Sequence, residues 1–533
     1  MTPSDVAMPS GAERVIELLR DEGVDRVFGN PGSTELAFVD ALVRCDDIDY
    51  VLGLHEGCVV PMADGYAQAT GRPAFVNLHT VSGLGNAIGV LANAKANGTP
   101  LVVTAGQQDV ALLPHGPLLG YDLVSMARPV VKWAAEVRSE AELGVMLRRA
   151  FLDAAAAPAG PVFLSLPHDI MHGAAPTALP ARSRLLPAGI AAGTGEIADL
   201  LAAARTPLVI VGQELATEAG SRAVIRLAEK LGAPLYGAFN NQRGVVPPGH
   251  PLWRGDMPAM AAAIATTLAP HDCILYAGGQ AFQLFGGPAG PLLPPESKLI
   301  HIAPDPSQLG RSVAATIGAF GDLASTLDAI ADHLPDRAAP LPAVPSPPAD
   351  PQSLRFDALA ACRILLEAMP DDAILHHELP TVGHAMRSLF RWRSTDQFFS
   401  SKQTIGWAMG AAVGVSLGHD RARRSIAIVG DGSAAFSLPA LWSAAQQKVP
   451  VIFAIVDNRG YEILEMMTRM MTGQRANRSP AFDIGEPALD FAGIARGFGV
   501  HGTVVSDADG LREEIGRALA STGPTLIHVK VEA

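Results

Sequence analysis

Two apolar runs in the C-terminal part of the chain each end on polar side chains that could hold a metal ion. Ser425–Val429 leads into Gly430-Asp431-Gly432, and Val451–Val456 leads into Asp457-Asn458. The segment between them is helical in pattern, so the stretch predicts a βαβ unit. Because the loops at the carboxyl ends of parallel strands share one crevice, we expect Asp431 and Asn458 to meet there. Oxygen ligands of this kind suit Mg²⁺ or Ca²⁺, and Mg²⁺ usually brings a phosphate group with it.

Three further residues could take part in chemistry, and each also has a plain structural interpretation. Glu56 follows the apolar run YVLGL and precedes a largely apolar helix, where a carboxylate can simply interact with the helix dipole. Ser33 lies in the turn Gly29–Ser33, and His79 ends an apolar run. The residues alone leave both interpretations open.

The composition excludes several classes of protein. The chain has 533 residues, 48% of them hydrophobic, and its formal net charge is −13. Without a run of Lys and Arg, such a chain is not expected to bind nucleic acid or an anionic membrane. The four cysteines follow no metal-ligand spacing, which is typical of free thiols in a reducing compartment. We find no signal peptide and no apolar run long enough to span a membrane, and therefore expect a cytoplasmic protein.

The order of the expected elements predicts an α/β fold with three doubly wound parallel-sheet domains. In the first block the strands 24–28, 50–54, 74–78 and 101–105 alternate with helices, and residues 82–86 form a loop. A second block shows the same alternation. A proline-rich stretch then predicts an exposed linker before the third block. The predicted ranges are residues 1–184, a central domain over 185–335, a linker over 336–353, and 354–533.

Several of these stretches resemble a known family. Gly430-Asp431-Gly432 followed by Asp457-Asn458 resembles the thiamine-diphosphate signature, although Asp457 replaces the first Asn of its closing pair. The segments GNPGSTEL, LHEGCVV, ADGYAQA, PAFVNLH and TIGWAMGAAVGVSLG resemble those of the benzoylformate decarboxylases. The resemblance covers nearly the whole chain and is thin in the middle block. It implies pyrimidine-binding, central and diphosphate-binding domains, in that order.

The resemblance also implies which residues bind thiamine diphosphate and its ion. Glu56 takes the place of the glutamate that hydrogen-bonds the aminopyrimidine and so promotes loss of the thiazolium C2 proton. Asp431, Asn458 and the carbonyl of Gly460 take the place of the ligands to Mg²⁺ or Ca²⁺. The other positions implied to contact the cofactor are Gln403, Ile405, Gly430, Gly432, Ser433 and Tyr461. Ile405 among them stands where a large aliphatic residue bends the cofactor.

On the substrate side the match is less complete. The resemblance implies that Ser33 binds the substrate carboxylate and that His79 assists proton transfer. Phe285 replaces the second histidine of the family, and His115 is a candidate substitute for it. The substrate pocket is then expected to include Ser33, His79, Phe285, Lys402 and Ile463.

The function implied is non-oxidative decarboxylation of a 2-oxo acid, of an aromatic kind like benzoylformate, to an aldehyde and CO₂. Two alternatives stay open, namely a carboligase or lyase like the acetolactate synthases and a non-catalytic member of the family. The resemblance further implies a dimer or homotetramer with active sites at the subunit interface. The middle block shows no nucleotide fingerprint, so we do not expect FAD.

Overall fold

The protein is described here by a computed structural model, which defines residues 8–284, 290–336, 341–342, 355–473 and 479–532. Most of the predicted linker over 336–353 lies outside the described residues, and so does Phe285.

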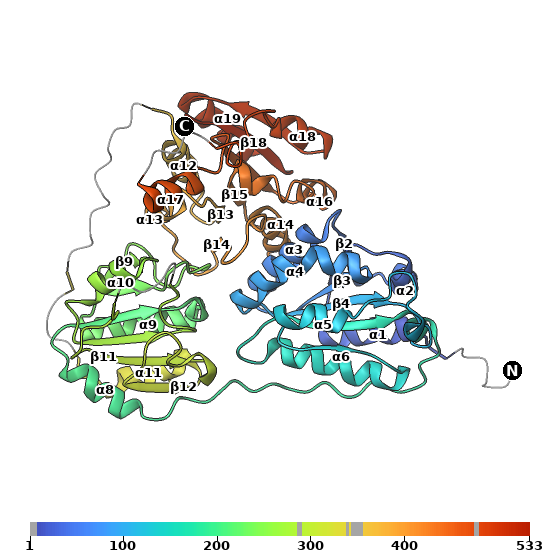
Figure 1. Ribbon diagram of the computed structural model, residues 1–533, viewed down its shortest axis with the longest axis horizontal. Coiled ribbons are helices and arrows are strands. Elements are labelled where there is room, and N and C mark those ends of the chain that lie inside the picture. The colour runs from blue at the N-terminus through green and yellow to red at the C-terminus, as the bar shows by residue number, and fades with distance from the viewer. Residues whose placement is uncertain (1–7, 285–289, 337–340, 343–354, 474–478, 533) are drawn as a thin grey trace. The chain divides into compact units, whose positions relative to one another are not determined.

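Three six-stranded sheets form the framework of the protein. Their strand orders are β2-β1-β3-β4-β6-β5, β12-β11-β10-β7-β8-β9 and β14-β13-β15-β16-β18-β17. Strand pairs of defined register within these sheets are parallel. Helices cover both faces, which is why the central strands read as nearly continuous apolar runs (Figure 1). The predicted α/β class with three parallel sheets is confirmed.

The first sheet lies between two helical layers. Successive side chains along each strand point to opposite faces of the sheet. Val102 of β4 therefore packs toward α1 and α6, and its neighbour Val103 is buried on the other face. Its strands are β1 (Arg26–Gly29), β2 (Asp49–Leu52), β3 (Ala74–Leu78), β4 (Leu101–Gln107), β5 (Ala134–Glu136) and β6 (Val162–Pro167). Its helices are α1 (Gly11–Glu22), α2 (Leu36–Val43), α3 (Glu56–Thr70), α4 (Thr80–Asn97), α5 (Leu123–Ala127), α6 (Glu140–Ala155) and α7 (His168–His172), with short 3₁₀ turns at Ser33–Glu35, Leu113–His115 and Arg128–Val130.

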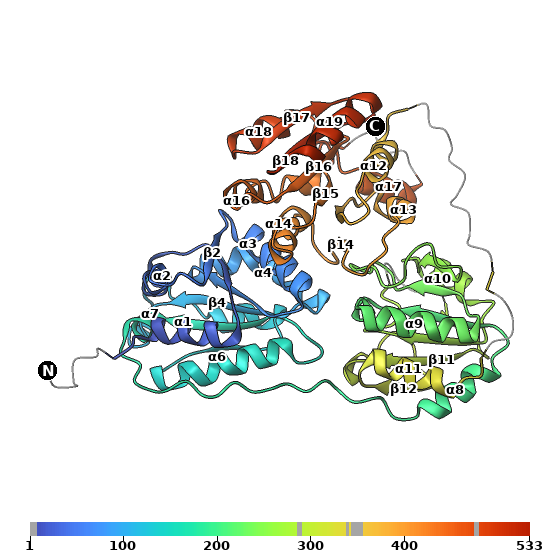
Figure 2. The ribbon, with the colours of Figure 1, turned by 180° about the vertical axis from the view of Figure 1, so that it is seen from behind.

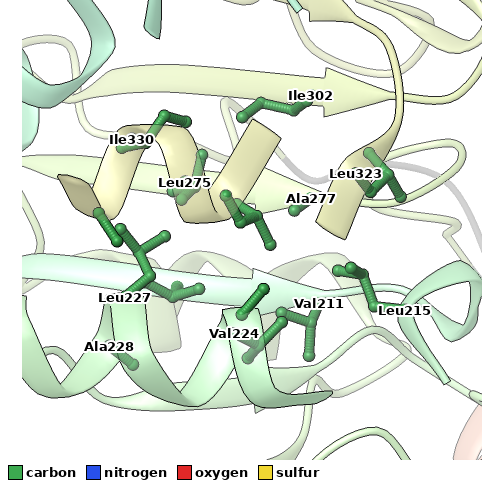
Figure 3. Packing of buried hydrophobic residues seen from close by; sticks show 14 of the residues in the cluster. Val211, Leu215, Val224, Leu227, Ala228, Leu275, Ala277, Ile302, Leu323 and Ile330 are labelled. Carbon is green, nitrogen blue, oxygen red and sulfur yellow. The ribbon is translucent and has the colours of Figure 1, made fainter. Parts of the chain in front are cut away.

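The second sheet has a core built mainly from aliphatic side chains. Figure 3 shows Val224 of α9 beside Val211 of β7, in the same cluster as Leu227 of α9 and Ile330 of α11. The strands are β7 (Pro207–Val211), β8 (Leu235–Gly237), β9 (Trp253–Asp256), β10 (Cys273–Ala277), β11 (Lys298–Ala303) and β12 (Ile317–Phe320). The helices are α8 (Thr194–Ala203), α9 (Glu218–Leu231), α10 (Ala261–Leu268) and α11 (Leu323–His333), with 3₁₀ turns at Gln213–Leu215 and Pro306–Gln308.

The third sheet carries the polar side chains of Asp431, Asp457 and Asn458 at the ends of two of its strands. Its strands are β13 (Ile374–Glu378), β14 (Phe398–Ser400), β15 (Ser425–Gly430), β16 (Val451–Asp457), β17 (His501–Val505) and β18 (Thr525–Lys530). Its helices are α12 (Ala358–Glu367), α13 (Gly383–Leu389), α14 (Ala408–Gly418), α15 (Asp431–Ala434), α16 (Ala440–Gln446), α17 (Glu462–Thr472), α18 (Phe491–Gly497) and α19 (Ala508–Ala520).

The chain forms two compact units. The first consists of residues 1–185, 353–383 and 403–533, and the second consists of residues 186–352 and 384–402. Within the first unit, helix α3 packs along helix α14 in both views (Figures 1 and 2). The approach is so close that a Cβ atom on Gly414 would lie 1.8 Å from the carbonyl oxygen of Met62. This contact therefore requires glycine, and it joins the helix that begins at Glu56 to the helix that follows Ile405.

The predicted loop over 82–86 is wrong, because these residues belong to helix α4, which begins at Thr80. Gly83 and Gly85 suggested a break in the chain, yet they serve close packing inside a helix. A Cβ atom on Gly83 would lie 3.3 Å from Oε1 of Glu56. The glycine thus makes room for the carboxylate of the neighbouring helix.

Within the part of the chain that the structure describes, every helix is too short or too polar to cross a lipid bilayer.

Candidate active site

A cavity of about 400 Å³ lies at the carboxyl edge of the third sheet, in the first unit. Strands β15 and β16 are neighbours, with Gly430 opposite Val456, so the loops that follow them start side by side. This register brings Asp431 and Asn458 to one cavity, as the sequence predicts. The residues that line it include Leu379, Ile405, Gly430, Asp431, Gly432, Ser433, Phe436, Asn458, Gly460, Tyr461, Ile463 and Leu464.

Backbone N–H groups hold the two oxygen-bearing side chains in place. Asp431 accepts hydrogen bonds from the N–H groups of Gly432 (2.8 Å) and Gly460 (3.2 Å). The amide oxygen of Asn458 accepts from Gly460 at 3.3 Å, and its amide nitrogen donates to Glu462 at 2.9 Å. A Cβ atom on Gly432 would lie 2.5 Å from the ring of Tyr461, so glycine is needed at this position.

A second carboxylate, Asp457, stands where the thiamine-diphosphate signature has its first Asn. Its Oδ2 atom lies 2.7 Å from Nε2 of the buried His528 on β18, and its Oδ1 atom accepts the N–H of Arg459 at 2.9 Å. Burial alone would raise the pKa of Asp457, but these hydrogen bonds lower the pKa overall. Burial, with Asp457 beside it, raises the pKa of Asp431 well above its usual range. A cation bound at Asp431 would offset this accumulation of negative charge.

The chemistry of the donors fits a hard cation that is shared with a phosphate. Among the described residues, no group of three or more His, Cys, Asp or Glu side chains is arranged to hold a metal. Asp431 and Asn458 would supply two oxygen atoms to such a cation, and its remaining ligands would come from the backbone, water or a bound ligand. This is the usual situation for Mg²⁺, which keeps waters and binds substrate phosphates.

Of the positions just before helix α14, only Ile405 lies in this cavity. The N–H of Gln403 donates to Oδ1 of Asn93 at 3.0 Å, and the Gln403 side chain is not among those lining the cavity. Lys402 belongs to the second unit, where it lines a different cavity together with Glu214. Burial lowers the pKa of the Lys402 ammonium group.

Glu56 is the first residue of helix α3 and is 6% exposed. Its carboxylate accepts hydrogen bonds from Nδ2 of Asn30 at 3.2 Å and Nδ2 of Asn86 at 2.9 Å. These two amides fix its orientation from the turn after β1 and from α4. Glu56 is not one of the described residues that line the cavity around Asp431.

His79 follows β3 and forms a pair with a buried carboxylate. Its Nδ1 atom lies 2.9 Å from Oε2 of Glu35, whose side chain is 2% exposed, while the His79 side chain is 22% exposed. Glu35 also accepts the N–H groups of Gly32 (2.8 Å) and Gly106 (2.9 Å). With Nδ1 engaged by Glu35, the Nε2 atom is the position from which His79 can exchange a proton.

Close packing and backbone strain hold this imidazole in its place. A Cβ atom on Gly32 would lie 2.3 Å from the ring of His79. Thr80, the next residue, has a φ of 41°, which is in the left-handed region and unfavourable for a β-branched side chain. Ser33 is exposed at the start of the 3₁₀ turn in the same loop as Gly32.

Sequence reasoning missed the residues that orient these groups. Asn30 and Glu35 are both in the quoted segment GNPGSTEL, and Asn86 is in the stretch mistaken for a loop. In the sequence, only their polar side chains next to small residues indicated a role for Asn30, Glu35 and Asn86. The residues that they orient lie on other strands and helices, so the pairs could be recognised only in the folded structure. His115 is exposed at the end of a 3₁₀ turn, and its side chain has no hydrogen bond to any other residue that the structure describes.

Comparisons with known proteins show the family to which the chain belongs. The N-terminal thiamine pyrophosphate binding domain of thiamine pyrophosphate enzymes matches residues 9–126, the central domain of these enzymes matches 194–330, and their C-terminal thiamine pyrophosphate binding domain matches 381–529. The chain belongs to the thiamine pyrophosphate enzyme family.

Within that family, the chain is similar along its whole length to decarboxylases of benzoylformate. It is 36% identical to a benzoylformate decarboxylase of Pseudomonas aeruginosa, over 97% of this chain and 98% of the relative. A solved 4-hydroxybenzoylformate decarboxylase of Rhodococcus jostii has a TM-score of 0.92 at 33% identity, covering 98% of this chain and 99% of that one. The acetolactate synthase isozyme 3 large subunit of Escherichia coli is 27% identical, over 96% of this chain and 92% of that protein.

Proposed function

We propose that this protein is a thiamine-diphosphate-dependent decarboxylase that converts an aromatic 2-oxo acid to an aldehyde and CO₂. The observation that carries the proposal is the convergence of Asp431, Asn458 and Ile405 on one cavity in a chain whose whole length matches benzoylformate decarboxylases. When bound, thiamine diphosphate supplies an electron sink for the carbon from which CO₂ departs.

The residues of the cavity divide between ion and cofactor. Asp431, Asn458 and the carbonyl of Gly460 would hold Mg²⁺, and the N–H groups near Gly432 and Ser433 would face the diphosphate. Gly430 and Tyr461 line the same cavity beside these residues. Ile405 would contact the cofactor from the wall of the cavity and help to orient it.

The N-terminal sheet would supply the groups that handle protons and substrate. Glu56, held by Asn30 and Asn86, would share a proton with the aminopyrimidine. His79, held by Glu35, would move a proton at Nε2, and Ser33 would bind the substrate carboxylate. The exposed edge of the His79 ring is compatible with this role.

A second subunit would complete each site. Glu56 and the Asp431 cavity belong to the same unit, yet Glu56 does not line that cavity. Pairing Glu56 of one chain with the cavity of another resolves this separation and supports a dimer, or a tetramer built from two dimers.

A cytoplasmic location is proposed from the buried, unbridged state of the four cysteines.

The wall of the cavity favours an apolar substrate group. Leu379, Phe436, Ile463 and Leu464 contribute aliphatic and aromatic surface beside the polar cofactor positions. Such a wall suits the phenyl ring of benzoylformate better than a second charged group.

One sequence feature favours carboligation as a second candidate. Phe285 stands where the benzoylformate decarboxylases have their second histidine, and a phenyl ring cannot transfer a proton. Slow protonation after CO₂ loss would give an acceptor aldehyde time to react. Phe285→His should then raise aldehyde release from benzoylformate, whereas an unchanged rate would count against placing Phe285 at this position.

The deciding experiment uses purified protein with thiamine diphosphate and Mg²⁺ and a panel of 2-oxo acids, with and without acceptor aldehydes. CO₂ and the organic products are measured together. CO₂ with free aldehyde from aromatic substrates supports the main proposal, and CO₂ with a coupled hydroxyketone supports carboligation. Glu56→Gln should reduce CO₂ release by about 10²–10⁴ while keeping the fold. Absence of CO₂ from every substrate would leave the non-catalytic interpretation.

A further inference from the structure

A buried carboxylate at the end of strand β13 contacts the segment that leads into helix α14. Glu378 is 5% exposed, and its carboxylate accepts hydrogen bonds from the backbone N–H groups of Gly406, Trp407 (2.8 Å) and Ala408 (2.8 Å). No residue at the start of α14 caps the helix with its own side chain. Glu378 therefore provides acceptors for N–H groups that a helix cannot satisfy internally.

Ile405 lies in the middle of a segment that is fixed on both sides. Before it, the N–H of Gln403 is held by Asn93, and after it the indole N–H of Trp407 donates to Asp64 at 2.7 Å. Gly406 has a φ of 84°, and a Cβ atom there would lie 2.6 Å from Cβ of Phe436. The turn after Ile405 is thus confined to one conformation, in which Glu378 accepts the N–H groups of Gly406 and Trp407.

The same carboxylate reaches the other side of the cavity. The hydroxyl group of Ser433, in the first turn of α15, lies near enough to the Glu378 carboxylate to lower its pKa, against the larger effect of burial. Glu378 itself does not line the cavity, whereas Ile405 and Ser433 both do.

We propose that Glu378 is a positioning residue of the cofactor site, which holds Ile405 and Ser433 where a bound thiamine diphosphate requires them. The inference rests on the proposed function, because it takes the Asp431 cavity to be the cofactor site. The family resemblance described above assigns no role to Glu378.

The first measurement is the affinity of Glu378→Gln for thiamine diphosphate at saturating Mg²⁺, by isothermal titration calorimetry. The amide keeps the size of the side chain but turns one acceptor into a donor that faces backbone N–H groups. We expect the Kd to rise about tenfold or more, as for other residues that orient ligand-binding groups. A Kd within twofold of that of the unmodified protein would overturn the proposal.

Glu22→Gln is a matched control in the same unit. The side chain of Glu22 is 6% exposed and pairs with Arg148 and Arg182, away from the cavity. This variant should unfold at a lower temperature and bind thiamine diphosphate as the unmodified protein does. If Glu22→Gln weakened binding as much as Glu378→Gln, the effect would be one of general stability and the proposal would fail.

A double-mutant cycle with Ile405→Ala tests whether Glu378 acts through Ile405. If it does, the double variant should lose no more than about twofold in kcat beyond the worse single variant, since both remove the same support. Fully multiplicative losses would refute the coupling. Should Glu378→Gln not fold, Glu378→Asp takes its place in both measurements, because it keeps the charge but shortens the reach to the three N–H groups.

The proposed function and the positioning role of Glu378 can be refuted separately. If the unmodified protein binds no thiamine diphosphate in the calorimeter, the proposed function is wrong. If it binds and the Glu378 variants bind equally well, only the positioning role is wrong.

Discussion

At the scale of single residues, the groups proposed for chemistry are each held by a polar side chain from another element. Asn30 and Asn86 orient Glu56, and Glu35 orients His79. Glu35 is buried and Asn30 is half-buried, so packing restricts their rotamers, whereas Asn86 is exposed. Such support fixes a reacting atom more firmly than a side chain in solvent could be fixed.

The pair of Glu35 and His79 gives the first prediction. Glu35→Gln removes the charge opposite Nδ1 of His79 and keeps only one of the two oxygen atoms that accept the N–H groups of Gly32 and Gly106. We expect kcat for benzoylformate to fall about 10- to 100-fold with little change in KM, because ground-state binding is left intact. Steady-state kinetics with CO₂ detection provide the measurement. An equal rise in KM would point instead to a role in substrate binding.

Glu378 gives a prediction on pH and stability. Burial raises the pKa of Glu378 to about 7, against a value of 4.5 for an unperturbed glutamate. Between these two values the folded state holds a proton that the unfolded state has released. The free energy of unfolding should therefore decrease as pH rises from about 4.5 to 7, and level off above that range.

Comparison of the unmodified protein with Glu378→Gln isolates this contribution. The glutamine cannot titrate, so the difference in free energy of unfolding between the two proteins should change with pH only in this window. Asp431, whose pKa is also raised, contributes equally to both proteins and cancels. Urea titrations of the apo-protein at several pH values test the expectation, and a difference that is independent of pH would contradict it.

At the scale of elements, helices α3 and α14 form the joint between the two sheets of the first unit. Gly65, Gly410 and Gly414 all lie where a side chain would meet the backbone or side chains of the opposite helix. Small residues thus allow two helices to approach closely, and Asp64 closes the contact by accepting the indole N–H of Trp407.

A substitution at this joint should be costly. Gly414→Ala would place a methyl group 1.8 Å from the Met62 carbonyl oxygen, so the helices must separate. We expect a loss of about 3 kcal/mol or more in the free energy of unfolding, at the upper end of overpacking effects. Gly516→Ala is the control, since nothing lies within 4 Å of its added Cβ in helix α19. It should stabilise the protein by about 0.5–1 kcal/mol in the same thermal or urea unfolding measurement.

The sequence was most informative about the helices and strands. Strand β3 was predicted at its observed bounds, because a buried parallel strand is a continuous apolar run between polar or glycine-rich ends. Short strands such as β5, β9 and β12 have mixed composition and were not foreseen. The start of α4 was misjudged because glycine in a helix reflects the neighbour it packs against, which a single sequence does not display.

At the site, Asp431, Asn458 and Ile405 line one cavity, and each was predicted from strand ends or from the family resemblance. Gln403 was predicted to contact the cofactor and Lys402 to lie in the substrate pocket, and neither lines the Asp431 cavity. The side-chain direction of residues in an irregular segment depends on contacts such as those of Glu378 and Asn93. Those contacts join positions far apart in the chain and leave no local pattern.

At the scale of the whole molecule, cofactor binding should be visible as a gain in stability. A ligand that binds only the folded protein adds about 2.7 kcal/mol when present at 100 times its Kd. We therefore expect thiamine diphosphate with Mg²⁺ to raise the thermal midpoint of the apo-protein by several degrees. Differential scanning fluorimetry measures this shift. Asp431→Asn should abolish most of it, and an unchanged midpoint for the unmodified protein would exclude the proposed cofactor.

The separation of Glu56 from the Asp431 cavity within one chain has a consequence for genetic complementation. If each site takes Glu56 from one subunit and Asp431 from the other, two inactive variants can rescue each other. Chains with Glu56→Gln, mixed with chains with Asp431→Asn, would form hybrid dimers containing one intact site and one doubly defective site. With random pairing, about a quarter of the sites of an unmodified preparation would be restored. Restored activity in co-expressed but not in separately expressed variants would demonstrate sharing of sites between chains without any structure of the assembly.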